Sequence, residues 1–317
     1  MAGLLRETTG AVVSPDDIRT IASGASGRAV MRWHDGARPY LGIFWTADRA
    51  DNNSFLPAAR HLLASGVRVP RVLAEKCLGD GVGVCLVDDL GDDSLLSAKE
   101  ADWEVVRSRY RAAFREVLAL HASGAPASWE LQPAFDEGLY LWEQGYFAEF
   151  YLGRHLGRDA AAFCLLPAMR DMAVHLAEYP RCPVHRDCQS QNILFRDGCA
   201  WLIDFQGMRL GLPEYDVASL VYDPYMGLAA ARRAVLLRDW EDVSGSSLDR
   251  DRLAGCALQR IMQAMGAFAN IGHNQSRAWY LEQIPPAQEA LRQVCSMEGV
   301  SPWIQRVFSC LRSEKVL

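Results

Sequence analysis

The apolar positions of the first hundred residues fall into short runs, interrupted by one helical stretch. Runs rich in β-branched and aromatic residues predict strands at 28–33, 39–45 and 83–90. Between them, Phe55, Ala59 and Leu62 recur at helical spacing and predict a helix over 53–66, which Gly66 ends. The order of strands, helix and further strands indicates a small β-rich unit.

Beyond residue 100 the pattern changes to long stretches in which apolar residues recur every three or four positions, as at Trp103, Val106 and Tyr110. Helices are predicted at 102–121, 136–156, 160–178, 228–241, 252–271 and 286–296. One β-hairpin, with strands at 193–195 and 200–205, interrupts this series. We therefore expect an α+β protein with two lobes: a β-rich N-lobe over 1–90 and a mainly helical C-lobe over 91–317.

Composition narrows the classes of protein that this pattern allows. Half of the 317 residues are apolar and the net charge is −6, which argues against nucleic acid or an anionic membrane as a partner. The 9 cysteines include no Cys-x-x-Cys pair, so neither a disulfide framework nor a structural zinc site is expected. Because the N-terminus lacks a long apolar run, we expect a cytoplasmic protein; its oligomeric state stays open.

The stretch from Val184 to Met208 carries the candidate chemistry, and in it a His-Arg-Asp triplet ends at Asp187. The carboxylate of Asp187 can accept a hydrogen bond from a substrate hydroxyl. Asn192 follows five residues later and Asp204 ends the second hairpin strand, and their oxygens suit Mg²⁺. Each triplet alone is a common accident, but this combined spacing predicts phosphoryl transfer from ATP or GTP. We expect the ring of His185 to hold the loop.

A protein kinase needs a long activation segment after its metal-binding aspartate, and this chain has no room for one. Only seven residues separate Phe205 from Pro213, so the Leu-Pro-Glu triplet that includes Pro213 is a chance match. Gln206 also stands where protein kinases have glycine. The acceptor is therefore expected to be a small molecule.

The stretch resembles the catalytic core of the aminoglycoside phosphotransferase and choline kinase superfamily, and segments 54–75 and 84–96 resemble its helix, strand and hinge. More narrowly, 135–157 and 203–225 are similar to the anomeric kinases of cell-wall recycling, which act on N-acetylmuramate and N-acetylglucosamine. The resemblance implies a bilobal protein-kinase-like fold and an ATP site between the lobes. By it, Asp187 is the catalytic residue, Asn192 and Asp204 bind magnesium, and the backbone of Asp88 and Leu90 holds adenine.

Candidate substrate residues come from two segments of the C-lobe. Glu143 and Phe147 lie at helical spacing before the catalytic loop, where a carboxylate could accept hydrogen bonds from sugar hydroxyls. Asp223 and Tyr225 form a second polar and aromatic patch. An ordinary core stripe explains the aromatic residues equally well. We expect Asp216 to pin the catalytic loop and to make no contact with substrate.

The phosphate-binding part departs from the family pattern. Residues 23–30 read as a glycine-rich turn, in which the backbone N–H groups of Ser26 and Gly27 could cradle phosphate. The strand expected to carry a phosphate-binding lysine has none, since the first lysine of the chain is Lys76. Arg28 could supply the missing charge because a guanidinium binds phosphate bidentately. The alternative is a pseudokinase that binds nucleotide without turnover.

The sequence thus predicts a magnesium-dependent kinase of a sugar hydroxyl, favouring the anomeric hydroxyl of an N-acetylhexosamine. Kinases of an aminoglycoside, a choline-like alcohol or an amino alcohol are the alternatives. The helices before the catalytic loop mix acidic residues with Arg154, His155 and Arg158, which mildly favours a neutral or anionic sugar over a polycationic antibiotic.

Overall fold

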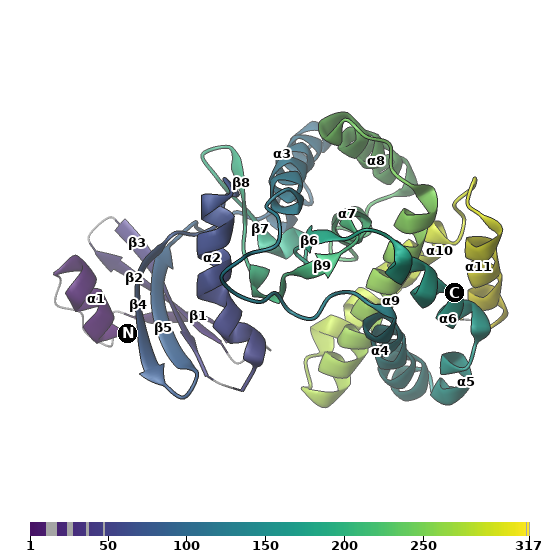
Figure 1. Cartoon of the computed structure of the whole chain (residues 1–317), viewed down its shortest axis with the longest axis horizontal. Helices are drawn as coiled ribbons and strands as arrows, with labels where there is room; N and C mark the ends of the chain where they lie inside the picture. The colour runs from purple at the N-terminus through teal and green to yellow at the C-terminus, as the bar shows by residue number, and fades with distance from the viewer. Residues whose placement is uncertain (11–17, 24–27, 36–37, 47, 315, 317) are drawn as a thin grey trace.

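A computed structural model describes the chain except for residues 11–17, 24–27, 36–37, 47, 315 and 317. Figure 1 shows a sheet at one end of the molecule and a larger group of helices at the other. The N-terminus lies at the sheet end and the C-terminus lies among the helices. The predicted two-lobed α+β architecture is confirmed.

The sheet is antiparallel, with strand order β1-β2-β3-β5-β4. Its strands are β1 (Arg19–Ser23), β2 (Ala29–Asp35), β3 (Arg38–Trp45), β4 (Val72–Gly79) and β5 (Val82–Asp88). Side chains alternate between its two faces, as they must in a pleated strand. On β5, Val84 and Leu86 join one cluster of buried residues, whereas Cys85 and Val87 join the other.

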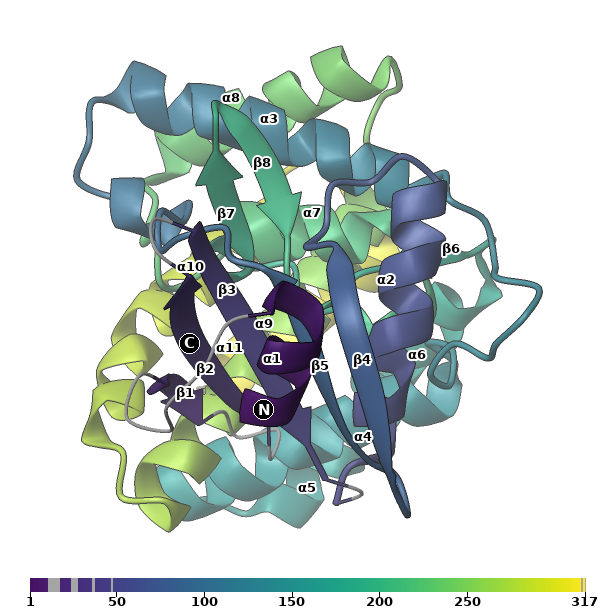
Figure 2. The ribbon, with the colours of Figure 1, turned by 90° about the vertical axis from the view of Figure 1, so that its left-hand side faces the viewer.

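Each face of the sheet is covered by a helix. The first cluster includes Leu4 and Leu5 of α1 (Ala2–Thr9), and the second includes Ala59 and Leu62 of α2 (Phe55–Ala64). Figure 2 shows α1 on the near face of the sheet. A 3₁₀ turn, η2 (Ala50–Ser54), precedes α2. This double cover explains why the central strands β3 and β5 read as nearly continuous apolar runs.

The helical lobe is organised around α9 (Arg250–Asn274), which is buried along most of its length. Small residues allow close contact there: a Cβ atom at Gly266 would lie 2.9 Å from Tyr146 Cδ1 and 3.1 Å from Phe147 Cα. The other helices are α3 (Trp103–His121), α4 (Glu137–Phe147), the π-helical η4 (Ala148–His155), α5 (Ala160–Cys164), α6 (Pro167–Glu178), α7 (Pro213–Val221), α8 (Ala230–Ser244), α10 (Ile284–Val294) and α11 (Pro302–Ser313). None of the helices in the described ranges is long and apolar enough to cross a membrane.

Four short strands lie between the lobes and hold the candidate loop. Strand β6 (Cys182–Val184) pairs with β9 (Arg209–Gly211), and β7 (Ile193–Arg196) pairs with β8 (Cys199–Leu202). The turn between β7 and β8 is Asp197-Gly198, with φ values of 53° and 73°. Two left-handed residues in an Asp-Gly turn match the twist of a tight hairpin. The segment 185–192 thus runs from one small sheet to the other.

Most predicted elements are present, with differences that have local causes. The helix predicted over 160–178 is divided into α5 and α6, because Pro167 disfavours helical geometry at Leu166, whose ψ is 117°. Helix α7 was not predicted, because its residues are almost all buried and leave no amphipathic pattern. Helix α11 and strand β4 were also missed; β4 is mostly exposed and lacks a continuous apolar run.

Candidate active site

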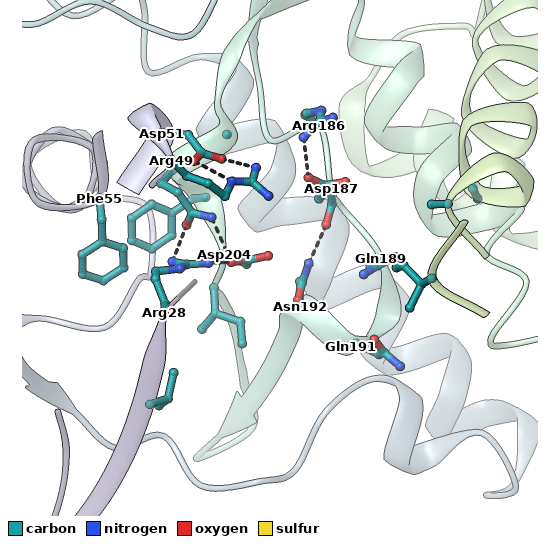
Figure 3. Close-up of a pocket in the computed structure, with 18 of the residues that line it drawn as sticks. Arg28, Arg49, Asp51, Phe55, Arg186, Asp187, Gln189, Gln191, Asn192 and Asp204 are labelled. Carbon is teal, nitrogen blue, oxygen red and sulfur yellow. Dashed lines mark hydrogen bonds and ion pairs between the residues drawn. The ribbon is translucent and has the colours of Figure 1, made fainter. Parts of the chain in front are cut away.

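A cavity of about 710 Å³ lies between the two lobes. We call the part against the strands the sheet end; its apolar lining is Val30, Leu41, Ile43, Val87, Leu90, Leu194 and Ile203. We call the part against α4 and α9 the helix end; its lining includes Trp142, Tyr146, Tyr225, Arg260, Gln263 and Asn270. The loop 185–192 lies between the two ends, as Figure 3 shows in part.

Asp187 faces the cavity from this loop and is held by two guanidinium groups. Arg186 Nη1 lies 3.2 Å from Asp187 Oδ2, and Arg260 Nη1 lies 3.6 Å from Asp187 Oδ1. Burial disfavours the charged carboxylate, but Arg186 and Arg260 outweigh it and lower the pKa of Asp187 to about 2. Asp187 is therefore ionised at neutral pH, which suits it to accept a hydrogen bond from a hydroxyl group.

The backbone of the loop is fixed by Asp216, whose side chain is fully buried. Its carboxylate accepts the N–H groups of His185 at 2.7 Å and Arg186 at 3.0 Å, and it lies 3.0 Å from His121 Nε2. The ring of His185 contacts the carbonyl of Ile203 at 2.9 Å. Arg186 has a φ of 76°, a conformation that L-residues rarely adopt and that these bonds hold in place.

Asn192 and Asp204 offer oxygen ligands on the same side of the cavity (Figure 3). Asn192 Nδ2 donates to the Asp187 carbonyl at 2.9 Å, which orients the amide oxygen away from that carbonyl. Asp204 has a φ of 64°, and its Oδ1 accepts bonds from Arg28 and, at 3.0 Å, from Gln206 Nε2. Both bonds go to Oδ1, and among the residues described no hydrogen bond to Oδ2 of Asp204 is present.

The donor set fits magnesium. Mg²⁺ prefers oxygen ligands and is usually bound through one or two carboxylates together with water and substrate phosphates. One amide and one carboxylate meet this requirement. In the ranges that the structure describes, no group of three His, Cys, Asp or Glu side chains could hold a metal by itself. A zinc-type site is therefore not indicated among these residues.

Arg28, just before β2, crosses from the N-lobe to the hairpin. Its Nη2 pairs with Asp204 Oδ1 and its Nη1 donates to Gln206 Oε1 at 2.8 Å, so Gln206 and Asp204 together hold one guanidinium group. Arg49 also lines the cavity and donates twice to Asp51, at 3.0 and 2.6 Å. No lysine lines the cavity in the described part of the chain.

Two other predicted nucleotide contacts, Ser26 and Gly27, lie outside the described residues. Asp88 and Leu90 both line the sheet end. The Asp88 carboxylate is engaged by Arg71, whose Nε donates to it at 2.6 Å, and the Asp88 N–H donates to the Arg71 carbonyl at 3.1 Å.

Of the four predicted substrate residues, Tyr225 lines the cavity, whereas Glu143, Phe147 and Asp223 lie behind its wall. Glu143 is 1% exposed and accepts a hydrogen bond from the hydroxyl of Tyr215 at 3.1 Å, and burial raises its pKa to about 7.

Phe147 stacks on Tyr151 with ring centroids 5.1 Å apart. Asp223 accepts the N–H groups of Ser190 at 2.7 Å and Tyr225 at 2.9 Å, so it joins the catalytic loop to the segment that carries Tyr225.

Sequence reasoning did not select the residues of α9 that line the helix end. Arg260, Gln263 and Asn270 recur at helical spacing along one face of α9. Arg260 is 9% exposed although it carries a charge. The available signal was Arg260, a charged residue in the middle of the mainly apolar predicted helix 252–271, because buried charges are usually paired at functional or structural sites.

A five-stranded sheet joined to a helical lobe, with an aspartate loop and a β-hairpin at their junction, defines a kinase-like phosphotransferase. Residues 17–256 match the model of the phosphotransferase enzyme family, and the chain belongs to this family. It is therefore a phosphotransferase, and the predicted resemblance to aminoglycoside phosphotransferases and choline kinases is confirmed.

Solved structures share the fold. Spectinomycin phosphotransferase, in complex with ADP and spectinomycin, superposes with a TM-score of 0.68 at 13% identity, covering 94% of this chain and 98% of that one. A choline/ethanolamine kinase family protein from Mesorhizobium loti gives a TM-score of 0.59 at 16% identity, covering 95% and 93%.

Relatives in sequence carry a narrower name. The chain is 29% identical over 288 residues to an N-acetylmuramate/N-acetylglucosamine kinase of Pseudomonas aeruginosa, covering 86% of this chain and 82% of the relative. It is 26% identical over 299 residues to the protein of the same name from Pseudomonas putida, covering 89% and 84%.

Proposed function

We propose that this chain is a cytoplasmic, ATP- and magnesium-dependent kinase that phosphorylates the anomeric hydroxyl of an N-acetylhexosamine such as N-acetylmuramate or N-acetylglucosamine, in cell-wall recycling. The observation that carries the proposal is one cavity, in which Asp187, Asn192 and Asp204 lie between an apolar end and an aromatic, amide-lined end. The names of the relatives support the choice of sugar.

In this reaction Asp187 orients the sugar hydroxyl by accepting its hydrogen bond. The hydroxyl oxygen then attacks the terminal phosphorus of the nucleotide, the bond from that phosphorus to the bridging oxygen breaks, and the nucleoside diphosphate leaves. The hydroxyl proton passes to Asp187 late in this step and from there to solvent. Because the transition state of phosphoryl transfer is loose, orientation matters more than strong base catalysis. A carboxylate with a pKa of about 2 is a weak base but a dependable acceptor, which agrees with this role.

Asn192 and Asp204 would hold Mg²⁺, which neutralises charge on the phosphate oxygens when it is bound. Arg28 would take the place of the phosphate-binding lysine, and Gln206 would hold its guanidinium group beside Asp204. The backbone N–H groups of Ser26 and Gly27 would also bind phosphate oxygens. Because guanidinium binds phosphate bidentately, one arginine can replace a lysine at this position.

Adenine would lie at the sheet end, between apolar side chains that include Val30, Leu41 and Val87. The backbone carbonyl of Asp88 and the N–H of Leu90 would bind its edge. Among the described residues that line this end, the Asp88 carboxylate is engaged by Arg71, so it does not select adenine over guanine by its charge. Both ATP and GTP therefore belong in the test.

The test supplies Mg²⁺ with either ATP or GTP and measures release of the nucleoside diphosphate over N-acetylhexosamines, hexoses, amino alcohols and aminoglycosides. It is combined with a reducing-end assay of the product. We expect turnover of N-acetylhexosamines and loss of the reducing end, because an anomeric phosphate blocks it. Turnover of an aminoglycoside or a choline-like alcohol alone would favour the alternative kinases. Nucleotide binding without any product would favour the pseudokinase.

A further inference from the structure

The helix end has an unusual charge balance for a site that could accept an amino sugar. Three charged side chains line it near the catalytic loop: the guanidinium groups of Arg186 and Arg260 and the carboxylate of Asp187. The remaining polar lining from α9 is uncharged, with Gln263 and Asn270 presenting amide groups. Among these described lining side chains, two guanidinium groups face one carboxylate, so the lining of the helix end carries more positive than negative charge; the carboxylates of Glu143 and Asp223 lie behind the wall.

Arg260 cannot easily turn away from the cavity. Its side chain is 11% exposed, and it is fixed by Asp187 Oδ1 at 3.6 Å, by Gln189 Oε1 at 3.3 Å and by Gln263 Oε1. Gln263 lies one helical turn from Arg260, so its amide is held next to the group that contacts Asp187. Amides can donate to an acyl carbonyl and accept from an acyl N–H, whereas they offer no countercharge to an ammonium group.

Aromatic rings of α4 line the helix end beside α9. Trp142 is 54% exposed and stacks on Tyr146 with centroids 5.4 Å apart, and the hydroxyl of Tyr146 accepts a hydrogen bond from Asn270 at 2.8 Å. Gly266 permits this arrangement, because a Cβ atom there would meet Tyr146 at 2.9 Å. Exposed rings of this kind suit the apolar face of a sugar ring, with a few polar groups to fix its orientation.

We propose that the helix end selects an N-acylated acceptor sugar against the same sugar with a free ammonium group, with Arg260 and Gln263 as the specificity-determining pair and Trp142 as the platform for the ring. This inference rests on the proposed function for the identity of the acceptor. The ammonium group is rejected because it meets net positive charge and uncharged amides; the acyl group is accepted because it hydrogen-bonds to amides.

The experiment compares N-acetylglucosamine with glucosamine below the pKa of the amine. Affinity is measured by calorimetry without nucleotide, and kcat/KM is measured with Mg-ATP. We expect glucosamine to bind and react roughly 30-fold less well, and the difference to shrink as salt is raised, because screening weakens charge repulsion. Equal affinity for the two sugars, or a difference that salt does not change, would overturn the inference.

Gln263→Glu makes the helix end neutral, and we expect it to reduce the discrimination to about threefold. Gln305→Glu is the matched control, because Gln305 is exposed on α11 and does not line the cavity. The control is expected to keep the wild-type ratio. If Gln263→Glu leaves the ratio of kcat/KM for the two sugars unchanged, or if the control lowers that ratio equally, Gln263 does not determine the selectivity.

Trp142→Ala is expected to weaken binding of N-acetylglucosamine about threefold to tenfold, with Trp142→Phe restoring most of it. Trp303→Ala, on α11 away from the cavity, controls for loss of an indole ring. Because binding is measured without nucleotide, the two proposals fail separately. Selective binding without phosphoryl transfer would contradict the proposed kinase alone, whereas turnover of both sugars at equal efficiency would contradict the selectivity alone.

Discussion

The middle of the cavity and its two ends are assembled in different ways. Asp187, Asn192 and Asp204 come from one loop and hairpin within a short segment of chain. The ends recruit residues from far away: Arg28 reaches Asp204 across 176 positions, and Arg260 contacts Asp187 from α9. The proposed catalytic and metal-binding residues are thus close together in the sequence. Nucleotide binding and selection of the acceptor depend instead on how the lobes and helices pack.

The strongest test of the middle region is Asp187→Asn. The amide keeps the shape but cannot accept the hydroxyl hydrogen bond as a carboxylate does, so kcat should fall about 1,000-fold while nucleotide affinity stays within a few-fold. Steady-state kinetics and nucleotide titration measure the two effects. Asp197→Asn is the matched control, since Asp197 lies in the hairpin turn with a side chain that is 90% exposed. Near-normal turnover in Asp187→Asn would contradict its role.

At the sheet end, Arg28→Ala should raise the KM for nucleotide about 30-fold, because it removes the guanidinium group that is proposed to bind phosphate and that Asp204 and Gln206 hold in place. Arg28→Lys should recover only part of this loss, because an ammonium group cannot reproduce the planar fork. Arg60→Ala is the control, since Arg60 pairs with Glu75 on the surface. A KM for nucleotide that does not change in Arg28→Ala would show that another cation binds the phosphates.

Loop geometry can be tested separately from loop chemistry at Asp216. Asp216→Asn replaces an acceptor of two backbone N–H groups by an amide, which should lower the free energy of unfolding by roughly 2 kcal/mol and kcat about tenfold. Thermal unfolding and kinetics give both values. Asp242→Asn, at a surface position whose side chain is 69% exposed, should change neither. Unchanged stability in Asp216→Asn would mean that the loop holds its shape without this carboxylate.

Glu143 gives the stability of the protein a dependence on pH, although it makes no contact with the cavity. Its pKa rises from 4.5 when unfolded to about 7 when folded, so between these values the folded state binds more protons and stability falls as pH rises. The loss at pH 8 is roughly 3 kcal/mol relative to pH 4. Glu143→Gln should abolish this contribution, so the variant should gain stability relative to wild type as pH increases. Thermal unfolding at pH 5 and pH 8 checks the sign, which a parallel pH response of both proteins would contradict.

The sequence predictions were accurate for elements that local sequence determines and failed for elements that depend on long-range packing. Strands β2, β3 and β5 and the hairpin could be predicted, because local apolar runs and an Asp-Gly turn determine them. The buried helix α7 could not, because burial on all sides removes periodicity.

For the site, spacing alone selected Asp187, Asn192 and Asp204, which line one cavity in the structure. Helical spacing could not decide which face of α4 is exposed to it. Trp142 lines the cavity, whereas its neighbour Glu143 turns to Tyr215, because α7 and α9 cover that face. Gln206 was read only as a replaced glycine, and its contact with Arg28 depends on long-range packing.

The most direct test of the central claim is a crystal structure of the protein with Mn²⁺, a non-hydrolysable ATP analogue and N-acetylglucosamine, with the metal located by its anomalous signal. We expect the metal at oxygen-ligand distance from Asn192 and Asp204, the base at the sheet end, and the anomeric hydroxyl between Asp187 and the terminal phosphate. A metal bound elsewhere, or a sugar whose anomeric hydroxyl points away from Asp187, would contradict the account.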